Sequence, residues 1–401
     1  MTLPRRAPSW IFGITSIPYG VCGSFISTLM PYFFRQAGIS VESIGWFATA
    51  AMVPAFLNFL YAPIVDLGLR RRTWLILMSI LSAFCLCVAL LLELPRQANL
   101  FVTFTFLGQL LNGLVGSCNG GLMATTLDDH ERGKAAGWLN AGNLGGGALG
   151  AGLILILAQS VPKLAIGAML AATMILPSLA ALAIPELVRP RSDAREHFRA
   201  MLQDVWTTAR SRAGWTGMLF CISPVGTAAL LNFFAAIAVD YRATPGVVAL
   251  VNGALNGLIT AVGAIGGGWL CDRMDRRIAY LMSGTLTAIV AVGMALAPLS
   301  PSTYAIGVCA YFLVSGFCYA AFSAVVLEAV GRAGASASAQ YALFVAAGNL
   351  AITYVGWLDT RFHHQYGPRA LLGVDAGLNL AGVLILGFVI AFVYQRRVPI
   401  E

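Results

Sequence analysis

Apolar segments of about 20 residues recur along the entire chain and are separated by short polar loops. A segment of that length crosses roughly 30 Å of hydrocarbon as an α-helix. Because lipid offers no partner for backbone N–H and C=O groups, each of these segments must be helical. Hydrophobic residues make up 58% of the chain and charged residues 10%, a balance too apolar for a water-soluble domain. The sequence therefore predicts an all-α integral membrane protein.

We expect twelve membrane helices, near residues 10–34, 41–64, 73–93, 100–124, 135–158, 164–184, 214–239, 246–270, 278–298, 304–327, 338–357 and 370–394. Nineteen of the 25 Lys and Arg residues then fall on the side that holds both termini. Short loops rich in Lys and Arg stay in the cytoplasm. The prediction is a multi-pass protein of the cell inner membrane with both termini cytoplasmic, in which the net charge of +8 indicates topology and no nucleic-acid partner.

A charged turn occurs twice. Residues 66–72 and residues 272–277 each place an acid at the end of an apolar run and arginines four and five residues later, with an offset of 206 residues. The segment Ala-Gly-Asn-Leu at 141–144 reappears at 347–350 with the same offset. Separate landmarks that share one offset, equal to about half the chain, indicate a duplicated unit.

The repeat divides the chain into three parts. We expect an N-terminal six-helix bundle at 1–184, a cytoplasmic linker at 185–213 and a C-terminal six-helix bundle at 214–401. The linker carries six arginines and is expected to be partly helical along the membrane surface. Pro18 in the first helix and Pro224 in the seventh lie at equivalent positions and predict a bend in each.

Glycines gather in the fifth and eighth predicted helices, at 142–152 and 263–268. Small residues let membrane helices approach closely. We therefore expect these two helices to pack against each other across the boundary between the bundles.

The sequence lacks the residue patterns that ATP hydrolysis, metal binding and enzyme catalysis require. The lysines, Lys134 and Lys163, do not lie in the GxxxxGK[ST] motif of ATP hydrolysis. All four histidines fall in predicted loops, and none of the eight cysteines has a metal-like CxxC spacing. Since no nucleophile or metal cluster is predicted at membrane depth, we expect no enzyme activity, no metal and no cofactor.

The polar side chains predicted at membrane depth are mostly neutral. A buried amide is costly unless it is paired, so each one either ties helices together or faces a wet cavity. Aromatic side chains at such positions serve packing as well as binding. We predict that six side chains contact a solute: Tyr19, Gln109, Asn112, Asn232, Tyr311 and Tyr319.

Asp375 is the carboxylate that the prediction places inside a helix rather than at its end. An ionisable residue within the membrane is by default a functional hypothesis, so Asp375 is the candidate for proton coupling. The alternative is structural, since at that depth its carboxylate could reach interfacial water or pair with Arg369.

The second charged turn, Gly268-x-x-x-Asp272-Arg273-x-x-Arg276-Arg277, resembles the signature loop of the major facilitator superfamily. The first copy is degenerate, with Ala62 for the glycine and Leu67 for the arginine. The resemblance covers the whole chain and implies a cavity between two bundles, with alternating access by rocking. It also implies that residues of the two turns hold one gate shut: Asp66, Arg70, Asp272, Arg273 and Arg276.

Within this superfamily, residues 34–45, Pro54 and residues 59–66 are similar to the muropeptide permease (AmpG-like) and acetyl-CoA transporter branch, and to related siderophore-importing permeases. This chain has Asn58 where relatives often carry a basic residue, and Asn119 where muropeptide permeases tend to carry an acid. Both departures remove charge from the expected cavity.

The resemblance implies a secondary active transporter that imports a fairly large polar organic solute by symport with protons. The solute would be muropeptide-like, siderophore-like or CoA-like, and the protein a monomer in contact with membrane lipid. Two alternatives remain at this point. A proton-driven exporter of small molecules or drugs shares the fold, and a non-transporting receptor or scaffold would need no open cavity.

Overall fold

A computed structural model of the chain provides the structure. All regular elements in the part that it describes are helices. The predicted linker at 185–213 lies largely outside that part. The described residues are 7–157, 160–186, 199, 203, 206–208, 210–331 and 336–395.

The N-terminal half consists of long apolar helices interrupted by short π or 3₁₀ segments, which carry the label η. In chain order the elements are α1 (Ile11–Ser24), η1 (Phe25–Leu29), α2 (Met30–Gln36), α3 (Val41–Phe56), α4 (Asn58–Tyr61), η2 (Ala62–Asp66), α5 (Arg71–Leu91), α6 (Ala98–Thr126), η3 (Asp129–Glu131), α7 (Arg132–Asn140), η4 (Ala141–Gly146), α8 (Gly147–Leu157), α9 (Lys163–Ser178) and η5 (Leu179–Ala183).

The C-terminal half repeats this plan. Its elements are α11 (Arg212–Ile222), η6 (Ala229–Asn232), α12 (Phe234–Ile237), α13 (Pro245–Val248), η7 (Ala249–Leu255), α14 (Asn256–Cys271), α15 (Arg276–Leu296), α16 (Pro301–Val330), α17 (Ala337–Tyr366) and α18 (Pro368–Gln395).

Most of the predicted membrane helices are long enough to cross a bilayer. Within the described residues, nine helices have the length and hydropathy of a membrane span, and the bent pair Ser43–Phe56 and Asn58–Asp66 makes a tenth. The other two predicted spans correspond to the succession α7, η4 and α8 and to the interrupted helix formed by α11, η6 and α12. This all-helical architecture agrees with the predicted twelve-helix plan.

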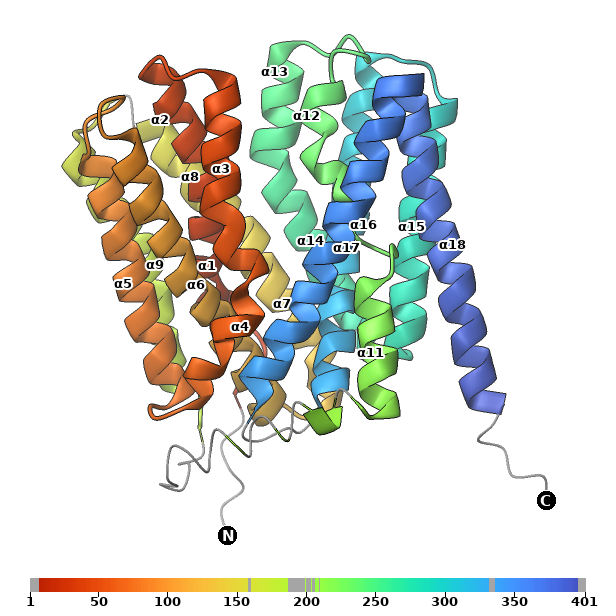
Figure 1. Cartoon of the computed structure of the whole chain (residues 1–401). Coiled ribbons are helices and arrows are strands. Elements are labelled where there is room, and N and C mark those ends of the chain that lie inside the picture. Colours follow the sequence, from red (N-terminus) through yellow and green to blue (C-terminus); the bar gives the residue numbers. More distant parts are fainter. Residues whose placement is uncertain are drawn as a thin grey trace.

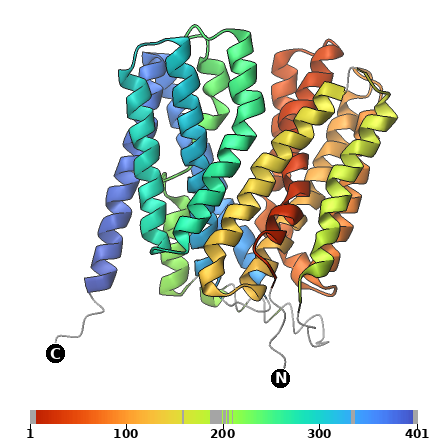
Figure 2. The same ribbon diagram turned by 180° about the vertical axis from the view of Figure 1, so that it is seen from behind.

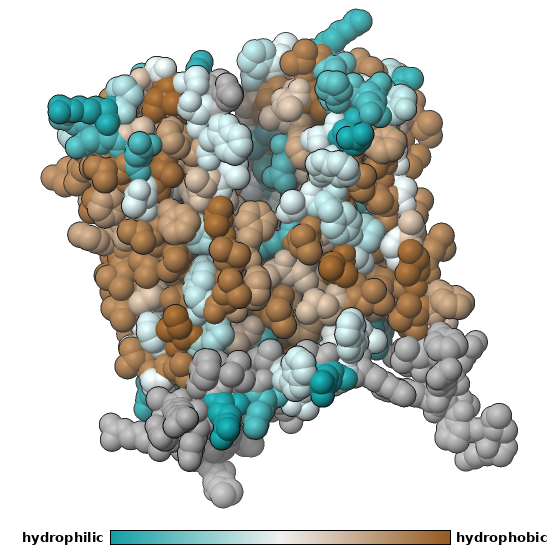
Figure 3. Space-filling view, viewed as in Figure 1, coloured by the Kyte–Doolittle hydropathy of each residue, from teal (hydrophilic) through white to brown (hydrophobic). Residues whose placement is uncertain are grey.

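The two halves form two bundles that stand side by side (Figures 1 and 2). We call the face at which α18 ends the terminal face; the described chain also begins there, at Ala7. The opposite face, which holds the α17–α18 turn at Gly367, is the open face, because the surface is hollowed between the bundles on that side (Figure 3). Hydrophobic residues cover the flanks at mid-height in the same view, as lipid contact requires.

The seventh predicted helix is broken rather than bent. α11 ends at Ile222, and the chain is not helical again until Ala229. Pro224 lacks the N–H that a helix would need there. Gly226 and Ala228 have φ angles of 62° and 51°, in a region that a right-handed helix cannot include. The prediction of a continuous helix at 214–239 was therefore wrong. We call residues 223–228 the unwound segment.

The eleventh helix is longer than predicted. α17 continues to Tyr366, nine residues past the predicted end at 357, and stops where Gly367 adopts a φ of 84°, which glycine tolerates and a right-handed helix cannot include. The polar residues beyond 357 had suggested a loop. The extension brings Asp359 into the helix.

The predicted packing of the fifth helix against the eighth is confirmed. α7 lies against α14 so closely that a Cβ atom on Gly268 would come within 2.4 Å of the carbonyl oxygen of Gly133. A side chain at this position would therefore push the backbones of the two bundles apart.

Candidate functional site

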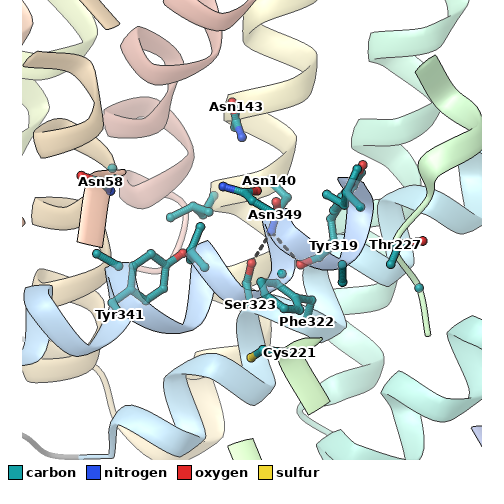
Figure 4. A pocket seen from close by; sticks show the side chains of 18 of the residues that line it. Asn58, Asn140, Asn143, Cys221, Thr227, Tyr319, Phe322, Ser323, Tyr341 and Asn349 are labelled. Atoms are coloured by element: carbon teal, nitrogen blue, oxygen red, sulfur yellow. Dashed lines mark hydrogen bonds between the residues drawn. The ribbon is translucent and has the colours of Figure 1, made fainter. Parts of the chain in front are cut away.

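A cavity of about 380 Å³ lies between the two bundles. Side chains from α1, α6, α7 and η4 meet side chains from the unwound segment, α16 and α17 in its wall (Figure 4). The polar residues of the wall are Ser16, Tyr19, Asn58, Ser117, Asn119, Asn140, Asn143, Ser223, Thr227, Tyr280, Tyr319, Ser323, Tyr341 and Asn349.

The cavity wall carries no acidic or basic side chain among the described residues. Its polar groups are amides and hydroxyls, interspersed with aromatic rings. The described residues also contain no group of three or more His, Cys, Asp or Glu side chains that could hold a metal ion. The wall can therefore both donate hydrogen bonds to a ligand and accept them from it, but it offers no counter-charge to an ion.

The repeat brings two equivalent asparagines to this cavity. Asn143 on η4 and Asn349 on α17 occupy the same place in the two copies of Ala-Gly-Asn-Leu, and both line the cavity from opposite bundles (Figure 4). Both are partly exposed. Neither side-chain amide forms a hydrogen bond with the described protein. Their donors and acceptors are thus available to a ligand.

Asn140 connects the bundles beside the cavity. Its Nδ2 atom donates to the Ser323 hydroxyl at 2.9 Å and to the Tyr319 carbonyl oxygen at 3.1 Å (Figure 4). Its amide therefore fixes α7 against α16.

Four of the six predicted solute contacts lie in the N-terminal bundle or at the cavity, and only two of these four line the cavity. Tyr19 and Tyr319 line the cavity. Gln109 and Asn112 are buried inside the N-terminal bundle instead. Gln109 accepts a hydrogen bond from the Cys22 thiol, and Asn112 donates to the Tyr19 carbonyl oxygen at 3.2 Å. They support helix α1, which carries Tyr19, rather than reach the cavity themselves.

The structure does not bring the other two predicted contacts to the cavity wall. Asn232 is exposed at the end of η6. Tyr311 is fully buried in the C-terminal bundle, where its hydroxyl donates to Oδ2 of Asp375 at 3.1 Å.

Asp375 is also fully buried, so its carboxyl does not reach interfacial water. Arg369 is exposed and forms no ion pair with it. A second carboxyl, that of Asp359 on α17, is equally buried. Asp359 was not among the predicted site residues because the predicted helix ended at 357.

At the terminal face, the charged turn of the C-terminal half meets the N-terminal half. Asp272 accepts hydrogen bonds from the backbone N–H groups of Gly133 and Lys134 at 2.7 and 2.8 Å, at the start of α7. Burial raises the pKa of Asp272, and these two N–H groups oppose that shift. A carboxylate at a helix N-terminus also interacts favourably with the helix dipole.

The charged turn of the N-terminal half makes the equivalent contact with the C-terminal half. Asp66 accepts a hydrogen bond from the backbone N–H of Ala339 at the start of α17. It also forms a buried ion pair with Arg71 at 2.7 Å, and Arg71 donates to the Ser338 hydroxyl at 2.9 Å. Arg71 therefore makes the contacts for which Arg70 was predicted, since the Arg70 side chain has no hydrogen bond or ion pair with the described residues.

The remaining predicted gating residues lie around Asp272. The exposed Arg273 stacks on the Trp269 ring, with its guanidinium carbon 3.4 Å from the ring centroid. Arg276 lies 3.9 Å from a carboxylate oxygen of Glu328. Both interactions lie within the C-terminal half, whereas the contacts of Asp66 and Asp272 join the two halves at the terminal face.

A family model of the Major Facilitator Superfamily matches residues 12–356. The chain belongs to the major facilitator superfamily. Solved structures of this superfamily resemble it over nearly its whole length. The human organic anion transporter MFSD10 (TETRAN) is 15% identical with a TM-score of 0.69, and the match covers 94% of this chain and 98% of that one.

Two proton symporters resemble it to a similar degree. The proton:xylose symporter XylE is 13% identical, with a TM-score of 0.69 and 94% of both chains covered. The E. coli fucose:proton symporter FucP is 17% identical, with a TM-score of 0.65, and the match covers 95% of this chain and 98% of that one. At these identities the likeness concerns the fold. Family and fold identify a multi-pass membrane transporter for small molecules, and not an enzyme.

Proposed function

We propose that this protein is a secondary active transporter of the inner membrane that imports a neutral polar organic solute together with protons. The observation that carries the proposal is the cavity wall of amides, hydroxyls and aromatic rings without an acidic or basic side chain. An ionic solute would lose its hydration there without gaining a counter-charge. A solute rich in hydroxyl or amide groups can replace its water hydrogen bonds.

The volume of the cavity limits the solute. About 380 Å³ lies at the low end of small-molecule sites. A solute of sugar or small-peptide size fits this volume, as does the corresponding part of a muropeptide-like or siderophore-like molecule. CoA fits the site poorly, because its phosphates would need cationic partners. The xylose and fucose symporters among the structural neighbours support a neutral hydroxylated solute.

We assign the terminal face to the cytoplasm, because Lys and Arg are concentrated on that side. With this orientation the protein is closed to the cytoplasm by the contacts of Asp66 and Asp272 and open to the outside. One match to FucP is to a structure in the outward conformation, with a TM-score of 0.66. Import then requires that both helix-end contacts break while the bundles rock about the cavity.

The test is uptake into vesicles that contain the purified protein. Labelled fucose, xylose, anhydro-muropeptide, a ferric siderophore and acetyl-CoA are compared, with and without a protonophore. We expect uptake of at least one neutral hydroxylated solute, protonophore-sensitive accumulation, and no uptake of acetyl-CoA. Uptake of acetyl-CoA alone would contradict the assignment of a neutral solute. Accumulation that the protonophore does not reduce would contradict proton coupling.

A further inference from the structure

Two carboxyls lie buried at the same depth of the C-terminal bundle. Asp359 on α17 and Asp375 on α18 are each eight residues from Gly367, which joins the two helices. At 1.5 Å per residue both are about 12 Å from the turn. Both are completely shielded from solvent, and the two side chains interact electrostatically.

Few groups around these carboxyls can stabilise a negative charge. From α16, the Tyr311 hydroxyl donates to Oδ2 of Asp375, while Oδ1 of Asp375 and both oxygens of Asp359 have no hydrogen-bond partner in the described protein. The other titratable group that faces Asp375 from α16 is the thiol of Cys318. No cation pairs with either carboxyl among the described residues.

This arrangement limits the charge that the pair can carry. Two neighbouring negative charges in a medium of low dielectric constant repel each other strongly and lose their hydration. One proton on the pair leaves one negative charge, which the Tyr311 hydroxyl stabilises on Asp375. The pair therefore has two accessible states, with one proton or with two.

A histidine lies between this pair and the open face. His363 lies one helical turn beyond Asp359 on α17, towards the open face. Its ring is 3.0 Å from a carboxylate oxygen of Asp240, and about a third of each side chain is exposed. Part of the ring is therefore accessible to water on the open face.

The pair is also connected to the cavity. Asn379 follows Asp375 by one turn of α18, and its Nδ2 atom donates to the Asp375 carbonyl oxygen at 2.9 Å. Its Oδ1 atom accepts from the backbone N–H of Gly226 at 2.9 Å. Gly226 and Thr227 belong to the unwound segment and line the cavity. Discontinuous helices form solute and ion sites in other transporters.

We propose that Asp359 and Asp375 form the proton site of this transporter, and that Asn379 couples the site to the unwound segment in the cavity wall. A hydronium ion on the open face gives a proton to a ring nitrogen of His363, and an N–H bond of His363 then breaks as an O–H bond forms on an oxygen of the pair. The pair changes from a charge of −1 to neutral, and release of that proton restores the charge. The proposal rests on the proposed transport function and names its energy-coupling site.

The first test needs no solute. Infrared spectra of the purified protein in vesicles are recorded over a range of pH, and the band of buried protonated carboxyls is followed. We expect the wild type to show a band that changes with pH, and Asp359→Asn and Asp375→Asn each to abolish this change. Glu93→Gln, which removes an exposed carboxyl in an open-face loop, is the matched control. A band whose pH response survives in both folded aspartate variants would overturn the proposal.

Tyr311→Phe gives a second measurement if an aspartate variant does not fold. It removes the hydrogen bond to Asp375 and no charge, so the frequency of the carboxyl band should shift. An unchanged frequency would also overturn the assignment.

The coupling is tested by hydrogen exchange of the unwound segment. We expect Asp375→Asn, which fixes a neutral side chain in the pair, to change amide exchange at residues 223–228 severalfold. The further substitution Asn379→Ala should abolish the difference. Equal exchange in the wild type and Asp375→Asn would contradict the coupling. Neither test uses a solute. A negative result in these tests therefore does not contradict the proposed solute cavity, and a negative result in every uptake assay does not affect the interpretation of these tests.

Discussion

The two halves of the molecule are copies of one repeat. The cavity asparagines and the terminal-face contacts occur in both halves, whereas the acids buried at membrane depth occur in the C-terminal half. Asn143 and Asn349 face the cavity from equivalent positions. The terminal-face contacts are equivalent too: Asp272 caps the helix that starts near Gly133, and Asp66 caps the helix that starts near Ala339, with the same offset of 206 residues. The solute cavity and the closure thus follow the pseudo-symmetry.

The buried acids do not follow it. With the same offset, Asp375 corresponds to Met169 and Asp359 to Leu153. The described part of the N-terminal bundle has buried amides inside but no buried acid at membrane depth. The comparison suggests that both halves bind the solute, and that the C-terminal half alone handles the proton.

The largest difference expected between the halves concerns the arginines of the charged turns. Arg71 and Arg277 are equivalent by the repeat, but the Arg71 side chain is 3% exposed in its ion pair and that of Arg277 is 31% exposed beside Glu328. Arg71→Ala removes the ion-pair partner of the buried Asp66 carboxylate and should cost about 3–5 kcal/mol of stability. Arg277→Ala should cost less than about 1 kcal/mol.

Thermal unfolding of the purified variants measures this contrast. The neighbouring substitution Arg70→Ala serves as the control, since Arg70 makes no such contact among the described residues. Equal destabilisation by the substitutions at 71 and 277 would mean that the two turns are closed in the same way.

A smaller effect is expected where the halves differ by one methyl group. The first half has Ala62 at the position equivalent to Gly268. Gly268→Ala would press a Cβ against the backbone of α7 and should destabilise the closed terminal face by about 1–3 kcal/mol. Gly266→Ala, on the same helix, meets no atom within 4 Å and is the matched control. Labelling of a cysteine introduced at the terminal face should therefore increase in the first variant alone.

The smallest effects are expected at the two cavity asparagines, and they should be alike. Asn143→Ala and Asn349→Ala each remove one set of hydrogen bonds to a neutral solute, worth about 1 kcal/mol. Each should raise the KM of uptake about fivefold without loss of folded protein. If one substitution had no effect on KM, the symmetric use of the cavity would be wrong.

Much of the fold could be predicted from the sequence, because membrane length, charge placement and the repeat act over long segments. The break at residues 223–228 could not. Proline is often tolerated in membrane helices, and the left-handed conformation of Ala228 arises from tertiary contacts. The end of α17 was misjudged because the residues after 357 are polar, and yet they continue the helix, mostly exposed, until Gly367 ends it with a positive φ.

The site was predicted only in part. Tyr19 and Tyr319 were identified, whereas Asn143 and Asn349 were recognised as a repeat but not as cavity residues. A sequence does not reveal which face of a continuously apolar helix meets the opposite bundle. The symmetry of the repeat was the signal that could have selected these asparagines. Equal spacing about Gly367 was the signal for Asp359 and Asp375.

One measurement tests the division of labour between the halves most directly. With a solute that the wild type takes up, Asp375→Asn is compared with the wild type in two assays on the same vesicles, exchange of solute at equilibrium and accumulation driven by a pH gradient. We predict that exchange persists, because the cavity is intact, and that accumulation falls to the equilibrium level. Accumulation at the wild-type level would contradict the account, since proton coupling would then not depend on the buried acids of the C-terminal half.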